Sequence, residues 1–308
     1  MSPSAPAPAP APGSARELIG VDLGGTAIKL LRCTTEGESL AELEVPTPRP
    51  AVPGAVTMAL VEAIERLDPD RRADRIGIGH PGPADRAGRV ARIAINLPGW
   101  REVPLADWLE PQLGRPVTCE NDANCAALGE AWRGAAQAMD DVVLLTLGTG
   151  VGGAVLLAGR LFRGHGGAAA EPGLIGVDPE GPPCNSGNRG SLESYCSLAG
   201  LARLSSLDPR ELLRRADAGD AQARRVWAAY GQRLGVGLSS LLYLFTPRLV
   251  LIGGGLSAAS HHFLPAAWEE VERRVLAVSR EGLEIRRGQL GNGAGRLGAA
   301  WLARDRLG

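Results

Sequence analysis

Two glycine- and threonine-rich segments, one in each half of the chain, constrain the fold most. The first is Asp22–Lys29, with the sequence DLGGTAIK, and the second is Leu147–Gly153, with the sequence LGTGVGG. Each lies between two short apolar runs, so each pattern predicts a strand, a tight turn and a second strand. Glycine lets a turn adopt positive φ and approach a ligand closely, and the free N–H groups of such turns bind anions. The pair therefore predicts a cleft that holds a polyphosphate from both sides.

Other interpretations of these glycines are weaker. Either turn alone would be taken as an ordinary hairpin turn, but two of them, with Asp22 leading the first, favour phosphate binding. Gly148, Gly150 and Gly153 also match the dinucleotide-binding pattern G-x-G-x-x-G. That pattern requires a helix after the turn, whereas Ala154–Leu157 is typical of a strand. The P-loop pattern G-x-x-x-x-G-K-[ST] does not occur in the sequence.

Composition narrows the class of protein. The 308 residues are enough for two domains with buried cores, and the net charge of -1 gives no electrostatic basis for binding nucleic acid or an anionic membrane. No apolar run reaches the roughly 18 residues that span a bilayer, and we expect no secretory signal. Five cysteines without the spacing of a disulfide framework indicate reduced thiols and a cytoplasmic protein. Residues 1–16, rich in proline and alanine, predict a disordered tail.

Predicted strands and helices alternate along the rest of the chain. Apolar runs predict strands at 18–21, 28–33, 40–45, 75–79, 90–95, 117–120, 142–147, 154–157, 248–252 and 283–289. Helical spacing predicts helices at 56–67, 105–113, 123–133, 191–205, 209–216, 221–245, 263–278 and 298–307. The strand–turn–strand pattern occurs twice, which indicates a duplicated α/β fold with a cleft between its halves. We expect a small N-terminal lobe at 17–121, completed by the C-terminal segment 297–308, and a large lobe at 122–296.

Asp122 is the strongest candidate for a catalytic residue. It follows a predicted strand and begins a predicted helix, between Asn121 and Asn124. A carboxylate at a helix start is usually an N-cap. In a cleft that holds a polyphosphate it would instead orient and deprotonate a hydroxyl for attack on a γ-phosphate, a reaction that depends mainly on positioning and charge neutralisation. This second interpretation predicts that Asp122 is a general base.

Other polar residues near the turns have candidate roles. Asp22 directly precedes the first turn, where it would bind Mg²⁺ or simply initiate the turn. Lys29 would contact phosphate or lie as a solvated lysine at a sheet edge. Gly253–Gly255 follow an apolar strand and would admit an adenine ring, or form an ordinary strand–helix turn. Side chains that could hold a sugar through paired donors and acceptors are those of Asn96, Asn121, Glu171 and Glu193.

At these residues the chain resembles the ROK family (repressor, open reading frame, kinase) and, within it, the bacterial glucokinases of the cyanobacterial type. The resemblance runs from about Leu18 to the C-terminus. It rests on motifs that occur in order at 22–29, 77–85, 96–100, 120–124, 148–153, 171–173, 184–193 and 253–255. The resemblance implies a two-lobed, actin/hexokinase-like (duplicated ribonuclease H-like) α/β fold with a cleft between the lobes, and usually a homodimer.

The resemblance also implies an activity, the transfer of phosphate from ATP with Mg²⁺ to the 6-hydroxyl of a hexose, with glucose expected. Asp122 would be the catalytic base, and the sugar would be bound by Asn96, Asn121, Asp122, Glu171 and Glu193. The residues expected to hold the nucleotide are Asp22, Gly24, Gly25, Thr26, Lys29, Gly148, Thr149, Gly150, Gly253, Gly254 and Gly255. Among these, Asp22 is the expected Mg²⁺ ligand.

One motif departs from the family pattern. Many members carry E-x-G-H followed by C-x-C-G-x-x-G-C-x-E, in which one histidine and three cysteines hold a structural zinc. Here Leu174, Ser186 and Ser191 occupy three of the four ligand positions, and Cys184 alone remains. One cysteine cannot build a tetrahedral site, so we predict no zinc. Leu174 also replaces a histidine that contacts sugar in the family, which leaves the preferred hexose open.

Three alternative functions stay open at this point. Another ROK hexose kinase would act on N-acetylmannosamine, fructose or allose, or would use polyphosphate as the donor. A sugar-sensing repressor of the family would need an N-terminal helix-turn-helix domain, for which the roughly 17 residues before the first strand leave no room. A non-catalytic sugar-binding module would not need Asp22, Asp122 and both glycine turns. The expected partners are therefore a hexose, ATP and a second copy of the chain.

Overall fold

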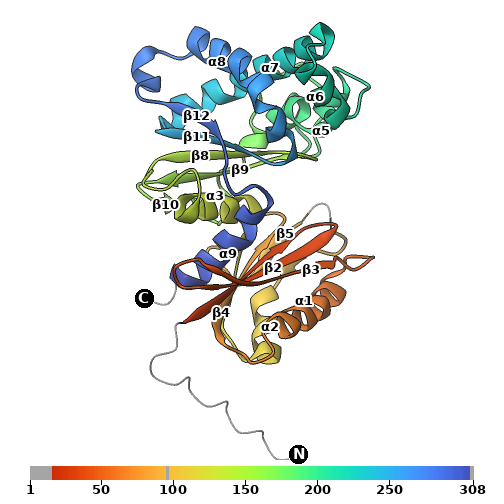
Figure 1. Ribbon diagram of the computed structural model, residues 1–308, viewed down its shortest axis with the longest axis vertical. Coiled ribbons are helices and arrows are strands. Elements are labelled where there is room, and N and C mark those ends of the chain that lie inside the picture. Colours follow the sequence, from red (N-terminus) through yellow and green to blue (C-terminus); the bar gives the residue numbers. More distant parts are fainter. Residues whose placement is uncertain (1–15, 95–96, 306–308) are drawn as a thin grey trace, which may run out of the picture.

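The computed structural model describes residues 16–94 and 97–305. The predicted tail, apart from Arg16, and the candidate sugar ligand Asn96 lie outside these ranges. The described residues form a mixed α/β fold with two five-stranded sheets. The sheets lie one beyond the other along the long axis of the molecule, with α3 (Asp122–Arg133) and α9 (Ala294–Asp305) between them (Figure 1).

The first sheet begins with the hairpin predicted around the first glycine turn. β1 (Glu17–Leu23) pairs antiparallel with β2 (Ala27–Thr34) and parallel with β4 (Ala73–His80), which in turn pairs parallel with β7 (Val117–Asn121). A buried apolar cluster joins one face of this sheet to α1 (Pro53–Leu67) and α2 (Leu105–Leu113). The strand order is β3 (Ser39–Pro46), β2 (Ala27–Thr34), β1 (Glu17–Leu23), β4 (Ala73–His80) and β7 (Val117–Asn121).

The C-terminal helix α9 covers the opposite face of the first sheet. It packs against β1 and β4 and also against α3. Glycine makes this close packing possible: a Cβ atom at Gly77 would lie 1.8 Å from the carbonyl oxygen of Ala299, and one at Gly298 would lie 1.6 Å from that of Cys125. Any larger side chain at either position would push the helix off its partner.

The second sheet repeats the hairpin start. β8 (Val142–Leu147) and β9 (Val151–Leu157) flank the second glycine turn, and β11 (Leu249–Gly253) pairs parallel with β8. Apolar side chains of this sheet pack on α7 (Ala221–Phe245) and α8 (Ser260–Arg274) on one face and on α3 on the other. The strand order is β10 (Arg160–Leu161), β9 (Val151–Leu157), β8 (Val142–Leu147), β11 (Leu249–Gly253) and β12 (Glu284–Arg287).

Shorter elements connect the two sheets and extend the second one. β5 (Ala91–Ile93) and β6 (Arg101–Val103) form a two-stranded ribbon. The remaining elements are η1 (Pro172–Leu174), α4 (Leu192–Cys196), α5 (Leu198–Ala202), α6 (Pro209–Asp217), η2 (Gly255–Ala259), η3 (Ala277–Arg280) and η4 (Gly291–Gly293). None of the described helices has the length and hydropathy needed to cross a membrane.

Several predicted elements differ from those observed. The helix predicted at 191–205 is two short helices, because Ser197 is extended and its hydroxyl accepts the N–H of Gly200. The helix predicted at 263–278 begins at Ser260 and ends at Arg274, where Val275 becomes extended. Of the strand predicted at 90–95, the described residues form only β5, and residue 95 lies outside the described ranges. β6 and β10 were not predicted. The last helix begins at Ala294 rather than at 297 or 298, because glycines with low helix propensity obscure its start.

Candidate active site

Asp122 is the first residue of α3 and follows β7 directly. The N-cap position belongs to Asn121, whose side-chain oxygen accepts the N–H groups of Ala123 and Asn124 at 2.9 and 3.0 Å. The Asp122 carboxylate accepts the Ala123 N–H at 2.7 Å. Because Asn121 already caps the helix, the carboxylate of Asp122 is not needed for that task.

The environment of Asp122 favours its protonated form. The pKa of Asp122 is raised from its ordinary 3.8 to about 6, mainly by burial and also by the negative charge of Asp22, while the hydrogen bond from Ala123 opposes the shift. A buried carboxyl group with a pKa near the working pH is suited to accept and release a proton.

Two more carboxylates belong to the same cluster, Glu171 and Glu193. The pKa of Glu171 is raised to about 7, mainly by burial and also by the charges of Asp122 and Glu193. Glu171 immediately precedes η1, which packs on β9 so closely that a Cβ atom at Gly173 would lie 1.8 Å from the Val151 carbonyl oxygen. The fold thus gathers Asp122, Glu171 and Glu193, three of the predicted sugar-binding residues, at one place.

Glu193 joins this cluster to the second glycine turn. The Ser191 hydroxyl accepts the N–H of Ser194 and so starts the short helix α4, which carries Glu193. One oxygen of Glu193 accepts the N–H of Val151 at 3.0 Å, and it would lie 2.5 Å from a Cβ atom at Gly150. Only glycine at position 150 leaves room for this carboxylate.

Asp22 lies at the end of β1, opposite Lys29 of β2. Burial raises the pKa of Asp22, while the positive charges of Lys29 and Arg296 oppose the shift. A Cβ atom at Gly295, in the first turn of α9, would lie 3.1 Å from the carboxyl carbon of Asp22. Asp22 and Asp122, both partly buried, therefore form a pair of interacting carboxylates, and such oxygen atoms are the ligands that Mg²⁺ prefers.

The two glycine turns have the predicted strand–turn–strand form. Thr47 fixes the first turn, because its hydroxyl donates to the carbonyl oxygen of Gly24 at 2.6 Å. In the second turn the N–H of Gly148 donates to the carbonyl oxygen of Gly150 at 3.0 Å. The tip residues Gly25, Thr26 and Thr149 are exposed. Their N–H and hydroxyl groups are thus accessible to a ligand.

The third glycine segment lines a cavity of about 300 Å³. Gly254 has a φ of 78°, and a Cβ atom there would lie 2.3 Å from the carbonyl oxygen of Leu147, so this segment contacts the second turn. The cavity is bounded by Gly253–Gly255 together with Thr146, Glu130, Arg287 and Asn292. This is the place where an adenine ring was expected against bare backbone.

Some residues around the site could not be found from sequence patterns. Glu130, buried in α3, accepts the N–H groups of Gln289 and Leu290 and so fixes the segment behind the cavity. Glu120, also buried, accepts a hydrogen bond from the Arg163 side chain at 2.6 Å. Arg287 and Asn292 line the cavity only because β12 and η4 return beside α3. Glu120 lies in the motif at 120–124, but its contact with Arg163 joins distant segments and has no local signal. No local motif marks the contributions of Glu130, Arg287 and Asn292, for the same reason.

The segment that carries zinc in many ROK proteins forms hydrogen bonds of its own. The Ser186 hydroxyl donates to the Cys184 sulfur at 3.4 Å. The Ser191 hydroxyl serves as the N-cap of α4. Leu174 ends η1 and is 36% exposed. The absence of zinc stays a prediction.

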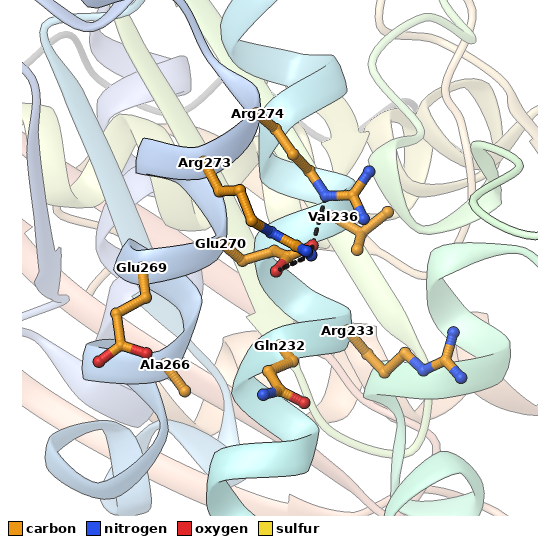
Figure 2. Close-up of a pocket in the computed structure, with 8 residues that line it drawn as sticks. All are labelled: Gln232, Arg233, Val236, Ala266, Glu269, Glu270, Arg273 and Arg274. Atoms are coloured by element: carbon orange, nitrogen blue, oxygen red, sulfur yellow. Dashed lines mark hydrogen bonds and ion pairs between the residues drawn. The ribbon is translucent and has the colours of Figure 1, made fainter.

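A larger groove, of about 450 Å³, lies between α7 and α8 and shares no residue with the candidate site. Figure 2 shows that charged side chains dominate it and that Glu270 pairs with both Arg273 and Arg274. In Figure 1, α7 and α8 cover the face of the second sheet opposite α3. The groove is therefore separate from the carboxylate cluster.

Comparisons with known proteins agree with this arrangement. The chain matches the model of the ROK family over residues 18–306. It is 36% identical over 318 aligned positions to a glucokinase of Halalkalibacterium halodurans, a match that covers 95% of this chain and 96% of that protein.

Two solved structures are similar along nearly the whole chain. A ROK hexokinase from Thermus thermophilus is 38% identical with a TM-score of 0.81, and the match covers 94% of this chain and 99% of that one. A ROK family glucokinase from Streptomyces griseus, in complex with glucose and AMPPNP, is 33% identical with the same TM-score and the same coverage. These neighbours confirm the predicted two-lobed α/β fold class. The chain therefore belongs to the ROK family.

Proposed function

We propose that the protein is a glucokinase that uses Asp122 as its general base. Family membership and kinase relatives along its whole length make the chain a sugar kinase. The observation that carries the finer proposal is the pKa of Asp122, about 6, within a cluster of carboxylates beside the glycine turns. A carboxylate with this pKa is a stronger base than an ordinary aspartate and is still ionised at neutral pH.

In the proposed reaction the 6-hydroxyl of glucose lies against Asp122. Asp122 accepts the hydroxyl proton as the oxygen attacks the γ-phosphorus of ATP, and ADP leaves. Glu171 and Glu193 accept hydrogen bonds from other sugar hydroxyls. The hydrogen bond from the Val151 N–H to Glu193 supports this proposal, because it fixes one sugar ligand directly to the second turn. One rigid unit would then position both the acceptor and the phosphates.

The nucleotide is proposed to lie between the three glycine segments. The turns at Gly24–Thr26 and Gly148–Gly150 would donate N–H groups to the phosphates, and adenosine would occupy the cavity at Gly253–Gly255. Asp22 would hold Mg²⁺, directly or through water, which neutralises charge on the transferred phosphate when it is bound. The raised pKa values of Asp22 and Asp122 support a cation here, because burial disfavours the charge of both carboxylates and the charge of Asp22 adds to the effect at Asp122.

The test is a coupled assay with MgATP and a panel of glucose, mannose, fructose and N-acetylmannosamine. Glucose turnover that collapses in Asp122→Asn would support both the substrate and the base. Asp70→Asn is the matched control, because that carboxylate is 72% exposed and distant from the site. Turnover with another sugar and not with glucose would change the proposed substrate but leave the proposed mechanism unchanged. A folded protein that binds sugar but turns over none, with ATP or with polyphosphate, would refute the kinase proposal.

Further predictions remain proposals of the same kind. We propose a small lobe at 17–121 completed by 297–308, a large lobe at 122–296, and a homodimer in the cytoplasm. The five cysteines are free, and four of them are buried, which supports a reducing environment. Light scattering after size-exclusion chromatography would measure the mass, and a monomer at working concentration would contradict the dimer.

A further inference from the structure

Two consecutive histidines and an aspartate meet at the end of the second sheet's helical layer. Asp217 is the last residue of α6, and His261 and His262 lie in the first turn of α8. The Nε2 atoms of His261 and His262 lie 2.9 and 2.7 Å from the same oxygen of Asp217. All three potential ligand atoms lie within 4.8 Å of one another. The fold brings them together across more than 40 residues of sequence, since Asp217 and His261 are 44 positions apart.

This convergence is unusual for neighbouring residues of a helix. Consecutive side chains point about 100° apart around the helix axis and normally do not face each other. Here the two imidazole rings lie 4.2 Å apart, and both turn toward Asp217, which approaches from a different helix. The charge of Asp217 is favoured in this setting: hydrogen bonds from His261 and His262 hold its pKa below the ordinary value.

We propose that Asp217, His261 and His262 form a site for a transition-metal ion of the Zn²⁺ class. Imidazole nitrogens suit Zn²⁺, Cu²⁺ and Ni²⁺, whereas Mg²⁺ prefers oxygen ligands. Three protein ligands leave a fourth position for water, as in Zn²⁺ sites that exchange ligands. The site therefore differs in chemistry from the proposed Mg²⁺ site at Asp22, and the Mg²⁺ of a kinase assay would not fill it.

The two imidazole nitrogens lie closer to Asp217 than they would with an ion bound. Tetrahedral Zn²⁺ with bonds near 2.0–2.1 Å holds its ligand atoms about 3.3 Å apart. Each Nε2–Oδ1 separation must therefore open by about half an ångström. The His261 and Asp217 side chains are 57% and 52% exposed and are free to move outward, while His262, only 13% exposed, provides a fixed ligand.

Metal binding would connect the end of α6 to the start of α8. Both helices pack against α7, and α8 begins just after η2, which starts at Gly255 of the adenosine cavity. An ion that binds the folded chain and not the unfolded chain stabilises the fold by mass action. We therefore expect Zn²⁺ to raise the unfolding temperature of this protein, independently of which sugar it phosphorylates.

The test uses the full chain, stripped with a chelator that is then removed. Zn²⁺ is titrated by calorimetry, and Co²⁺ is titrated by visible absorption, which reports the coordination geometry without any assay of activity. We expect one ion per chain and a rise in unfolding temperature. His262→Gln and Asp217→Asn should each weaken binding by more than about tenfold, the smallest loss seen when a mere partner of a metal ligand is removed.

Two control variants separate this site from other thiol or imidazole groups. His165→Gln removes an exposed histidine outside the cluster, and Cys184→Ser removes the partly exposed cysteine of the former zinc segment. Both should bind Zn²⁺ as the unaltered chain does. Cooperative unfolding of each metal-free variant verifies that it is folded. The proposal would be overturned if His262→Gln and Asp217→Asn bound Zn²⁺ as tightly as the unaltered chain. It would also be overturned if Cys184→Ser or His165→Gln lost binding, or if the unaltered chain did not bind one ion.

Discussion

Two aspartates, the fully buried Asp68 and the partly buried Asp122, lie in opposite electrostatic environments. Burial opposes the charge of Asp68, but N–H groups of Ala73 and Arg72 and the guanidinium groups of Arg32 and Arg115 hold its pKa below the ordinary value. At Asp122 burial raises the pKa, and the largest effect of a neighbouring charge comes from another carboxylate, Asp22. The cations and N–H groups around Asp68 thus stabilise the folded protein.

The arrangement around Asp122 costs folding free energy, and it provides a carboxylate with a raised pKa. An uncompensated buried carboxylate persists only where something else requires it, and active sites are where such groups gather. The contrast therefore supports the proposal that Asp122, rather than Asp68, has the chemical task. The same isosteric substitution at the two positions tests this difference directly.

The largest expected effect is the loss of turnover in Asp122→Asn. Asparagine keeps the shape of the side chain but cannot accept the hydroxyl proton, so kcat should fall by about 10²–10⁴-fold, the usual contribution of a general base. The KM for glucose should change much less. Steady-state kinetics with MgATP measures both constants, and a kcat within a few-fold of the unaltered protein would show that Asp122 is not the base.

The next effect is the loss of stability in Asp68→Asn. This change leaves Arg115, which is only 7% exposed, without its buried counter-charge. Removing one partner of a buried ion pair should lower the free energy of unfolding by about 3 kcal/mol. Urea denaturation measures the change, with Asp70→Asn as an exposed control. The kcat of the folded fraction should stay unchanged, and a fall in kcat with normal stability would contradict this assignment.

Asp122→Asn should have the opposite effect on stability from Asp68→Asn. The folded protein holds the Asp122 proton more tightly than the unfolded chain, since the pKa is about 6 rather than 3.8. Ionisation of Asp122 therefore costs about 1–3 kcal/mol of folding free energy, and this cost develops as pH rises from about 4 to about 6. Asparagine removes it. Thermal unfolding should show a more stable variant at pH 7 and equal stability near pH 4, and a less stable variant at pH 7 would be inconsistent with a raised pKa.

The smallest effect concerns the pH dependence of the reaction. Because the base must be ionised, kcat/KM should rise with pH through about 6, the pKa of Asp122. Asp22→Asn removes the charge that helps to raise the pKa of Asp122. In the pH profile of the residual activity of this variant, the rise in kcat/KM should therefore occur at slightly lower pH. The shift should be small, because burial is the larger cause. An unchanged or higher limb in Asp22→Asn would mean that the two carboxylates do not interact.

The sequence alone could predict features that depend on neighbouring residues. The hairpins around both glycine turns, the long helix α7 and the strand–helix junction at Asn121–Asp122 follow from local patterns and lie where they were expected. The fold class follows from the alternation of strands and helices and from the family resemblance. The roles given to the site residues stay predictions, and Asn96 lies outside the described residues.

Features that depend on distant contacts could not be predicted. Glu130 fixes the segment at Gln289 across 159 positions of sequence, and nothing around Glu130 signals that contact. The start of α9 was missed because its glycines are poor helix formers. They are present because α9 must approach Asp22 and α3 closely, and Gly295 and Gly298 permit that approach. Tertiary packing overrides local propensity at these positions.

The position of α9 has a consequence for biosynthesis. The first sheet is translated early, but the helix that covers one of its faces is among the last elements to be made. Until α9 arrives, apolar side chains around Leu18, Leu31 and Cys33 lack the α9 residues Leu297, Ala300 and Ala303 that pack on them. The strands of the first sheet must therefore wait through the synthesis of the entire second sheet, and during that interval the nascent chain exposes a surface prone to aggregation or to binding by a chaperone.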